Sequence, residues 1–184
     1  MKIALTGGIA SGKSTLLTML RECGASVVNA DAIARDILWN SNIQARLMSL
    51  AGSDEPISPV FLRDFIAASD KNRRAVNRIM HPAIAEELAA STATVIEVPL
   101  LFEACLHVAF DAIWVAFCTR ETQSKRLRER YGEQADYPQF SWQLDSKVAL
   151  AFADAVISTE TGEPETRASL LQEAKRWGLP LVVS

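Results

Sequence analysis

A glycine-rich stretch near the N-terminus has the residue types and the spacing of a phosphate-binding loop. Four residues separate Gly7 from Gly12-Lys13-Ser14, which fits the pattern G-x-x-x-x-G-K-[ST]. Glycines leave room for backbone N–H groups around an anion, and a helix that begins there adds the positive end of its dipole. Because average residue frequencies give this pattern by chance in about 1% or fewer of chains of this length, we interpret the stretch as a nucleotide-phosphate site.

Three side chains extend this site toward the nucleotide phosphates and a metal ion. Lys13 is expected to place a mobile positive charge at the β- and γ-phosphates, and the Ser14 hydroxyl is placed to bind Mg²⁺. Glu97, near the end of the apolar run 94–98, resembles the acid that acts on Mg²⁺ directly or through water in such sites. The sequence therefore predicts Ser14 and Glu97 as the metal-site residues.

The elements that must position these residues alternate between strand and helix. Strands are predicted at 2–6, 25–28, 94–98, 112–117 and 155–157, and helices from the loop to about 21 and at 32–39, 120–131, 141–152 and 163–177. Residues 180–183 are either an edge strand or an apolar terminus packed on the core. This alternation predicts an α/β fold with three α/β/α layers around a five-stranded, mostly parallel sheet, in a single domain of residues 1–184.

Residues 40–91 show no strand-like alternation, and we expect them to form a helical insertion. The expected breaks in it are Gly52, Pro56, Pro59 and Pro82. Its closely spaced basic side chains are Lys71, Arg73, Arg74 and Arg78. A solvated helix face is the more common reason for such a cluster, and phosphate binding is the alternative.

Residues 120–143 are expected to form a lid above the phosphate loop. Within them, Gln123, Arg126 and Arg130 are spaced i, i+3 and i+7, so that they share one helix face. Arginines in such a place can clamp a transferring phosphoryl group. Together with the short chain and the lack of a guanine-reading Asn-Lys-x-Asp motif, they favour a small-molecule kinase over a motor or a switch.

Composition and charge argue against several classes of partner and compartment. The formal net charge of -3 gives no general attraction to nucleic acid or to an anionic membrane. No run of about 18 apolar residues is available to cross a membrane. The three cysteines, Cys23, Cys105 and Cys118, include no C-x-x-C pair, which favours a reducing compartment over a disulfide framework or a zinc site. With a strand at the N-terminus in place of a signal peptide, we expect a cytoplasmic protein. Its oligomeric state stays open.

Five blocks of the sequence resemble the dephospho-CoA kinase family, and they occur in the family's order. They are 5–15 (LTGGIASGKST), 28–35 (VNADAIAR), 81–84 (HPAI), 98–103 (VPLLFE) and 123–130 (QSKRLRER), followed by Gln143 and Ala153-Asp154 at family-like separation. The resemblance implies that ATP, with Mg²⁺, phosphorylates the ribose 3′-hydroxyl of dephospho-CoA to give coenzyme A. ATP and dephospho-CoA are then the expected partners.

The resemblance also implies roles for residues of this chain. Asp31 becomes the general base, whereas its own position before a predicted helix leaves an N-cap role equally open. Lys13, Arg126 and Arg130 complete the implied catalytic set, and which arginine contacts the transferred group stays open. The implied ATP-binding residues are Gly8, Ala10, Ser11, Gly12, Lys13, Ser14 and Thr15. The implied acceptor-binding residues are Thr6, Asp31, Arg78, His81, Leu100 and Glu103, and the resemblance implies that the helical insertion 40–91 forms much of the acceptor pocket.

Several positions depart from the family's pattern. Ala10 stands where the family usually has glycine, which is tolerable at a negative φ and restrictive at a positive one. The other departures are Asn29, Ser58-Pro59, Gln139, Ala149, Leu150, Phe152 and Ser158-Thr159. These changes keep two alternatives open: a related nucleoside or nucleotide kinase with another acceptor, and a nucleotide-binding protein with impaired catalysis.

Overall fold

The computed structural model describes residues 1–132 and 146–182. The chain divides into two compact units. The first, called the sheet unit here, comprises Met1–Val28 and Thr92–Ser184, and the second, the helical unit, comprises Asn29–Ser91. Among the helices of the described ranges, none combines the length and the apolar character needed to span a membrane.

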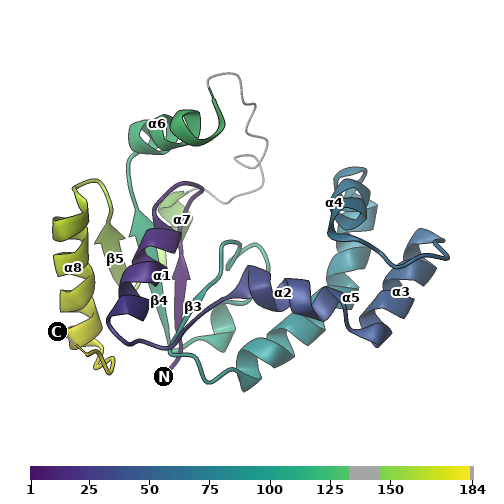
Figure 1. Ribbon diagram of the computed structural model, residues 1–184, viewed down its shortest axis with the longest axis horizontal. Helices are drawn as coiled ribbons and strands as arrows, with labels where there is room; N and C mark the ends of the chain where they lie inside the picture. The colour runs from purple at the N-terminus through teal and green to yellow at the C-terminus, as the bar shows by residue number, and fades with distance from the viewer. Residues whose placement is uncertain (133–145, 183–184) are drawn as a thin grey trace. The chain divides into compact units, whose positions relative to one another are not determined.

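Five strands form one sheet in the order β2-β3-β1-β4-β5 (Figure 1). They are β1 (Ile3–Thr6), β2 (Val27–Asn29), β3 (Val95–Glu97), β4 (Ala112–Phe117) and β5 (Ala155–Ser158). Strand β1 pairs in parallel with both β3 and β4, and β4 pairs in parallel with β5. This confirms the predicted α/β fold with a five-stranded, mostly parallel sheet.

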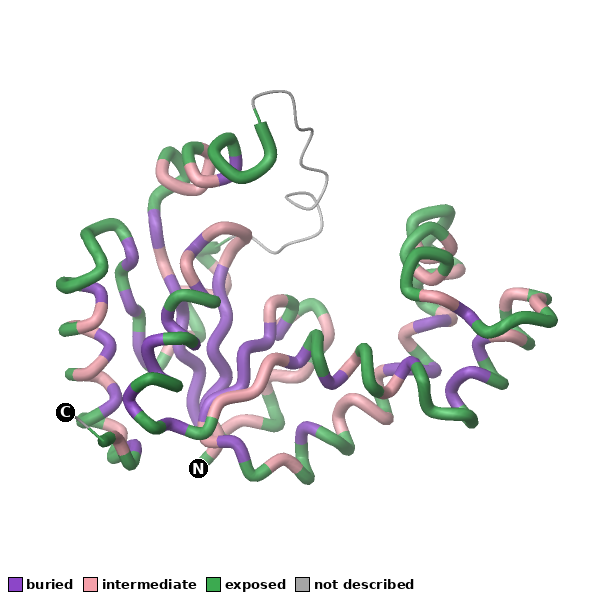
Figure 2. Tube along the Cα trace, in the orientation of Figure 1, coloured by how far each residue is buried: buried purple, intermediate pink, exposed green. Residues whose placement is uncertain are grey.

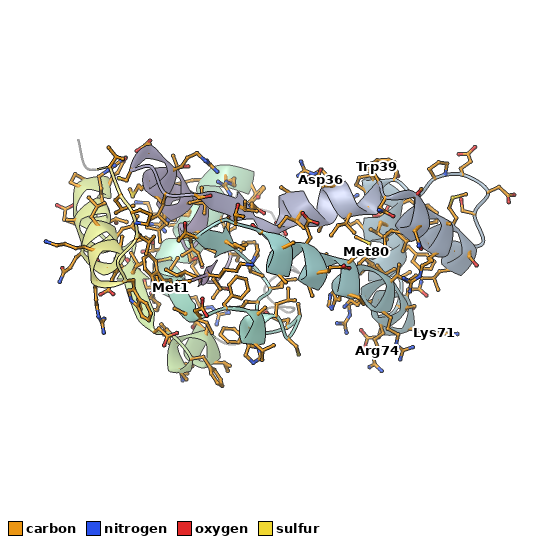
Figure 3. All side chains as sticks on the ribbon, turned by 90° about the horizontal axis from the view of Figure 1, so that it is seen from below. Met1, Asp36, Trp39, Lys71, Arg74 and Met80 are labelled. Carbon is orange, nitrogen blue, oxygen red and sulfur yellow. The ribbon has the colours of Figure 1, made fainter. Side chains whose placement is uncertain are left out.

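The strands are apolar because helices and loops cover both faces of the sheet, as parallel sheets require (Figure 2). On one face, α1 (Lys13–Glu22) and α8 (Glu163–Arg176) pack their leucines against Ile3, Leu5 and Trp114. On the other face lie the short 3-10 helix η1 (His107–Ala109) and α7 (Ser146–Ala151) (Figures 1 and 3). Helix α6 (Arg120–Tyr131) follows β4 with the bounds predicted for it.

The C-terminal residues settle an alternative that the sequence leaves open. Residues 180–182 form no strand. Leu181 packs against the sheet core, and the backbone N–H of Val182 donates to Cys23 O at 2.8 Å. The packed apolar terminus is therefore the correct interpretation for these residues. The predicted polar loop after α6 and the start of the predicted helix 141–152, including Gln139 and Gln143, lie outside the described residues.

The helical unit has its own core. Its helices are α2 (Ala30–Leu38), α3 (Ser41–Ala51), α4 (Pro59–Ala67) and α5 (Asp70–Ala90). The buried apolar side chains of this core are Leu38, Ile43, Leu47, Ile57, Val76, Ile79 and Met80. The buried amide of Gln44 ties the unit together, since it donates to Leu38 O and Ile57 O at 2.8 and 3.0 Å and accepts from Ile57 N. The prediction of helices without strands is confirmed here.

The prediction that Pro82 breaks a helix is wrong, because α5 runs through it from Asp70 to Ala90. Proline removes one backbone hydrogen bond and costs about 3 kcal/mol or more inside a helix. Packing on both sides of Pro82 offsets this cost: Ile79 and Met80 precede it, Ala83 and Ile84 follow it, and all four pack on the core of the helical unit. By contrast, Pro59 stands at a helix start, after the N-cap Ser58, where proline is favourable.

Candidate active site

The loop between β1 and α1 has a backbone that fits a phosphate group. Gly7 has φ 145° and a Cβ there would lie 2.4 Å from Ala116 O, so only glycine fits. Among the described residues, no acceptor pairs with the N–H groups of Gly8, Ala10, Gly12, Ser14 and Thr15. The Oγ of Ser11 is buried and also lacks a partner there. Unpaired donors of this kind suit anionic oxygens.

Lys13 places its charge against this loop. Its side chain is buried, and Nζ donates to the carbonyl oxygens of Gly7 and Gly8, each at 2.9 Å. Ser14 and Thr15 follow in the first turn of α1 with exposed side chains. The predicted ATP-binding residues thus form one continuous segment that ends in a helix N-terminus.

The two predicted metal-site residues lie in the same unit. Glu97 is 3% exposed and ends β3, where it is in register with Leu5 on the neighbouring β1. Ser14 is exposed at the start of α1. No group of three or more His, Cys, Asp or Glu side chains among the described residues could hold a metal ion. Hydroxyl and carboxylate oxygens suit Mg²⁺, which in nucleotide sites takes one or two protein ligands together with phosphates.

Ala10 has a left-handed backbone with φ 56°, so its departure from glycine falls in the restrictive case. For a residue with a Cβ this conformation costs about 1–2 kcal/mol. Its carbonyl oxygen accepts from Nη1 of Arg126 at 3.1 Å and faces the Cys118 thiol at 3.9 Å. The strained residue is therefore contacted by two side chains that are distant from it in the sequence.

The structure distinguishes the two arginines of α6. Arg126 donates to Ala10 O, to Thr159 Oγ1 at 3.0 Å and to Thr159 O, so its guanidinium is engaged with the loop. Arg130 is exposed, and it forms no hydrogen bond or ion pair with the residues that the structure describes. Gln123, on the same face, lines a cavity.

This cavity, of about 570 Å³, opens beside the loop at the carboxyl edge of β1 and β4. Thr6 and Glu103, both predicted to bind the acceptor, line it together with Ser11, Arg120 and Gln123. Leu100, also predicted, is 43% exposed and is not part of the described cavity wall. The cavity provides polar groups within reach of the phosphate loop, as an acceptor site requires.

Two residues that lie close to the ends of β4 and β5, Cys118 and Glu160, have shifted pKa values. Burial raises the pKa of the Cys118 thiol, which keeps it protonated beneath the loop. Glu160 accepts from the backbone N–H of Thr119 and from Thr122 Oγ1, and these hydrogen bonds lower the pKa of its carboxyl. Glu160 thereby ties the segment after β5 to the N-terminus of α6.

In the helical unit, Asp31 is not the N-cap of its helix, and that interpretation was wrong. Asn29 is the N-cap, since its Oδ1 accepts from Asp31 N at 2.7 Å. Helix α2 then begins at Ala30, which puts Asp31 in the first turn. The Asp31 carboxylate is exposed and bonds to none of the described residues. Asn29, one of the departures from the family's pattern, thus has a structural task of its own.

The other predicted residues of the helical unit lie along α5. Arg78 is exposed, and His81 is half-buried, so that burial lowers the pKa of its imidazole and favours the neutral form. Near the start of the helix, Arg73 pairs with Asp70 at 2.8 Å. The side chains of Lys71 and Arg74 extend outward from α5 (Figure 3). The basic cluster is therefore a solvated face in this structure.

Sequence reasoning gave no site role to Cys118 or to Thr159, although Ser158-Thr159 was noted there as a departure from the family's pattern. Each follows a strand directly, Thr159 after β5 and Cys118 after β4. Ligand-binding residues of open parallel sheets collect at the carboxyl ends of the strands. That rule, applied to every predicted strand, would have identified both positions.

Known proteins resemble this chain over nearly its whole length. The family model for dephospho-CoA kinase matches residues 1–165. The dephospho-CoA kinase of Geobacillus kaustophilus is 31% identical over 196 residues, covering 96% of each chain. That of Carboxydothermus hydrogenoformans is 32% identical over 194 residues, covering 95% of this chain and 93% of the relative.

Solved structures share the fold. A dephospho-CoA kinase from Campylobacter jejuni superposes with a TM-score of 0.73 at 20% identity and covers 96% of this chain and 98% of its own. A shikimate kinase from Acinetobacter baumannii reaches a TM-score of 0.58 at 13% identity, with 96% and 92% covered. At these identities the likeness shows a common kinase fold.

Proposed function

This chain belongs to the dephospho-CoA kinase family, and we propose that it transfers the γ-phosphoryl group of ATP to the ribose 3′-hydroxyl of dephospho-CoA. The observation that carries the proposal is the match to the family over residues 1–165, which includes a loop with unpaired N–H groups for phosphate oxygens. The products are coenzyme A and ADP.

The reaction is an in-line displacement. The 3′-oxygen of the acceptor attacks the γ-phosphorus, the bond to the bridging oxygen of the β-phosphate breaks, and ADP leaves. We assign the proton of the 3′-hydroxyl to the Asp31 carboxylate. Its support is local: the side chain is exposed, and Asn29 rather than Asp31 serves the helix as its cap. A carboxylate that forms no hydrogen bond with the described residues is available to accept a proton.

Phosphate binding falls to the loop. The N–H groups of Gly8, Ala10, Gly12, Ser14 and Thr15, together with the Lys13 ammonium, would hold the β- and γ-phosphates. Arg130, with no bond to the described residues, is the arginine we assign to the transferred phosphoryl group, and Arg126 is assigned to the loop itself. Bound Mg²⁺ supplies charge neutralisation at the phosphates, and we assign Ser14 and Glu97 to hold it.

The acceptor is assigned to the cavity beside the loop. Thr6 and Glu103 in its wall are supported as acceptor-binding residues. Arg78, His81 and Leu100 keep this assignment on the resemblance alone. The compartment we assign is the cytoplasm, where Cys23, Cys105 and Cys118 would persist as the free thiols that the structure contains.

An acceptor assay tests the proposal. Purified protein is incubated with ATP, Mg²⁺ and dephospho-CoA, and coenzyme A and ADP are quantified by chromatography with mass detection. We expect equal amounts of the two products and no ADP without the acceptor. Other nucleosides and nucleotides are offered in parallel. Turnover of one of these without formation of coenzyme A would show that the acceptor has been assigned wrongly.

A further inference from the structure

Thr159 connects three parts of the sheet unit. It follows β5, is 4% exposed, and its backbone N–H donates to Phe117 O at 2.8 Å. Its Oγ1 donates to Ser11 O at 2.8 Å, with Phe117 O also within 3.3 Å. The same Oγ1 and the Thr159 carbonyl oxygen accept from Arg126. One buried side chain thus joins the phosphate loop, the end of β4 and helix α6.

We propose that Thr159 is a positioning residue for the phosphate loop. The peptide between Ser11 and Gly12 is trans, so its C=O and N–H point in opposite directions. The Thr159 hydroxyl holds the Ser11 carbonyl on its own side of the loop. The N–H of Gly12, which no described residue accepts, is thereby turned the other way, where it can bind a phosphate oxygen. This inference rests on the proposed function, since it requires ATP in the loop.

Arg126 holds the carbonyl group of Ala10, the residue that precedes Ser11 in the loop. Its guanidinium bonds to Thr159 and to Ala10 O, and Ala10 has the strained φ of 56°. Thr159 supplies two of the acceptors that fix Arg126, so it also supports the carbonyl of Ala10 indirectly. The carbonyls of two successive loop residues, Ala10 and Ser11, are thus held by one hydrogen-bond network.

The shape of Thr159 allows its hydroxyl to be tested separately from its packing. A Cβ on Gly12 would lie 3.0 Å from Cγ2 and 3.1 Å from Oγ1 of Thr159, so the side chain fills the space beside this glycine. Thr159→Val keeps that volume and removes the hydrogen-bonding group. Thr159→Ser keeps the hydroxyl and removes the methyl group.

Thr166 offers a matched control. It is also 4% exposed, and its Oγ1 lies 3.4 Å from the carbonyl oxygen of Ser158, the last residue of β5. Thr166→Val therefore removes an equally buried hydroxyl that faces the end of β5 from helix α8, and it leaves the phosphate loop unchanged. A purely structural role for Thr159 predicts similar behaviour of the two valine variants.

The measurement is ATP affinity by titration calorimetry in the presence of Mg²⁺, together with the KM for dephospho-CoA and the Tm of each protein. We expect Thr159→Val to raise the Kd for ATP on the order of tenfold, because it leaves the Ser11 carbonyl without its donor. Thr159→Ser is expected to stay within about threefold of wild type, and Thr166→Val to leave the Kd unchanged. The KM for dephospho-CoA should not move in any of them.

Equal ATP affinity in Thr159→Val and wild type would overturn the inference and leave the proposed reaction standing. The same holds if Thr166→Val weakens ATP binding as much as Thr159→Val. Wild-type protein that binds ATP but forms no coenzyme A would instead overturn the acceptor assignment alone. If Thr159→Val does not fold, Thr159→Ala carries the test with the same expected loss.

Discussion

The guanidinium of Arg126 donates to the carbonyl oxygen of Ala10 across 116 positions of sequence, at 3.1 Å. Ala10 is one of two non-glycine residues with a positive φ among those described, the other being Cys105. A side chain expected in a lid therefore holds a strained residue of the phosphate loop. The two residues can be substituted separately, and we expect the two substitutions to have different effects.

Replacing Ala10 with glycine should stabilise the protein. At φ 56° the Cβ of alanine costs about 1–2 kcal/mol, and the greater freedom of glycine in the unfolded chain returns part of this gain. We expect Ala10→Gly to raise the free energy of unfolding by about 0.5–1 kcal/mol, measured by urea denaturation. As a control, Ala45→Gly in the middle of α3 should lower it by about 1 kcal/mol. A destabilised Ala10→Gly would show that the positive φ carries no strain.

The two arginines of α6 should give different kinetic results. Arg130→Ala removes an exposed side chain without partners among the described residues, so stability should change by less than about 0.5 kcal/mol. If Arg130 contacts the phosphoryl group in the transition state, kcat should fall on the order of 10²-fold.

Arg126→Ala should instead weaken ATP binding and lower Tm, because it removes three hydrogen bonds around the loop. Steady-state kinetics and thermal unfolding of both variants check the assignment. A large loss of kcat without a change in Tm for Arg126→Ala would reverse it.

Asp31 and Asn29 separate catalysis from capping. Asp31→Asn should reduce kcat by about 10²-fold or more through loss of the base, with ATP affinity retained. Its stability should fall by no more than about 1 kcal/mol, the share of a carboxylate near a helix N-terminus. Asn29→Ala should lower stability by about 1 kcal/mol, because it removes the cap at Asp31 N. An Asp31→Asn enzyme with normal turnover would exclude Asp31 as the base.

Glu160 should make the sheet unit sensitive to acid. Its hydrogen bonds with Thr119 and Thr122 lower the pKa of the carboxyl in the folded state below its ordinary value of 4.5. The lowered pKa contributes to the free energy of unfolding; this stability is fully present above the unfolded pKa and is lost as the pH falls through the folded pKa. We expect urea denaturation at pH 7 and at pH values below 4.5 to show that the free energy of unfolding falls less on acidification for Glu160→Gln than for wild type. Glu86→Gln, at an exposed site on α5, is the control and should follow wild type.

Much of the fold could be predicted because buried positions of strands and helices require apolar residues at characteristic spacings. The apolar run 112–117 and the following helix have the bounds of β4 and α6, since both depend on local residue types and on capping by Thr119. Pro82 was misjudged because its cost is a local quantity, whereas the packing of Ile79 and Ile84 that offsets it is a tertiary one.

The site was predictable only where function is local to a motif. The loop from Gly7 to Thr15 follows from its own spacing. By contrast, spacing says that Arg126 and Arg130 share a helix face, but not that Arg126 meets Ala10 and Thr159. Asn29 and Asp31 are both good capping residues, and only the backbone of Asn29, with φ -108°, decides between them.

The parallel pairing of β1 has a consequence for the order in which the chain can fold. Ile3 lies in register with Val95 on one side and Ala112 on the other, so the first strand made is flanked by strands made much later. The core of the helical unit, by contrast, draws only on residues from Ile37 to Ile84. Because local contacts form faster than distant ones, we expect amides of α3 and α5 to gain hydrogen-exchange protection before those of β1 during refolding. During synthesis, β1 cannot pair with β3 and β4 until these two later strands have been made.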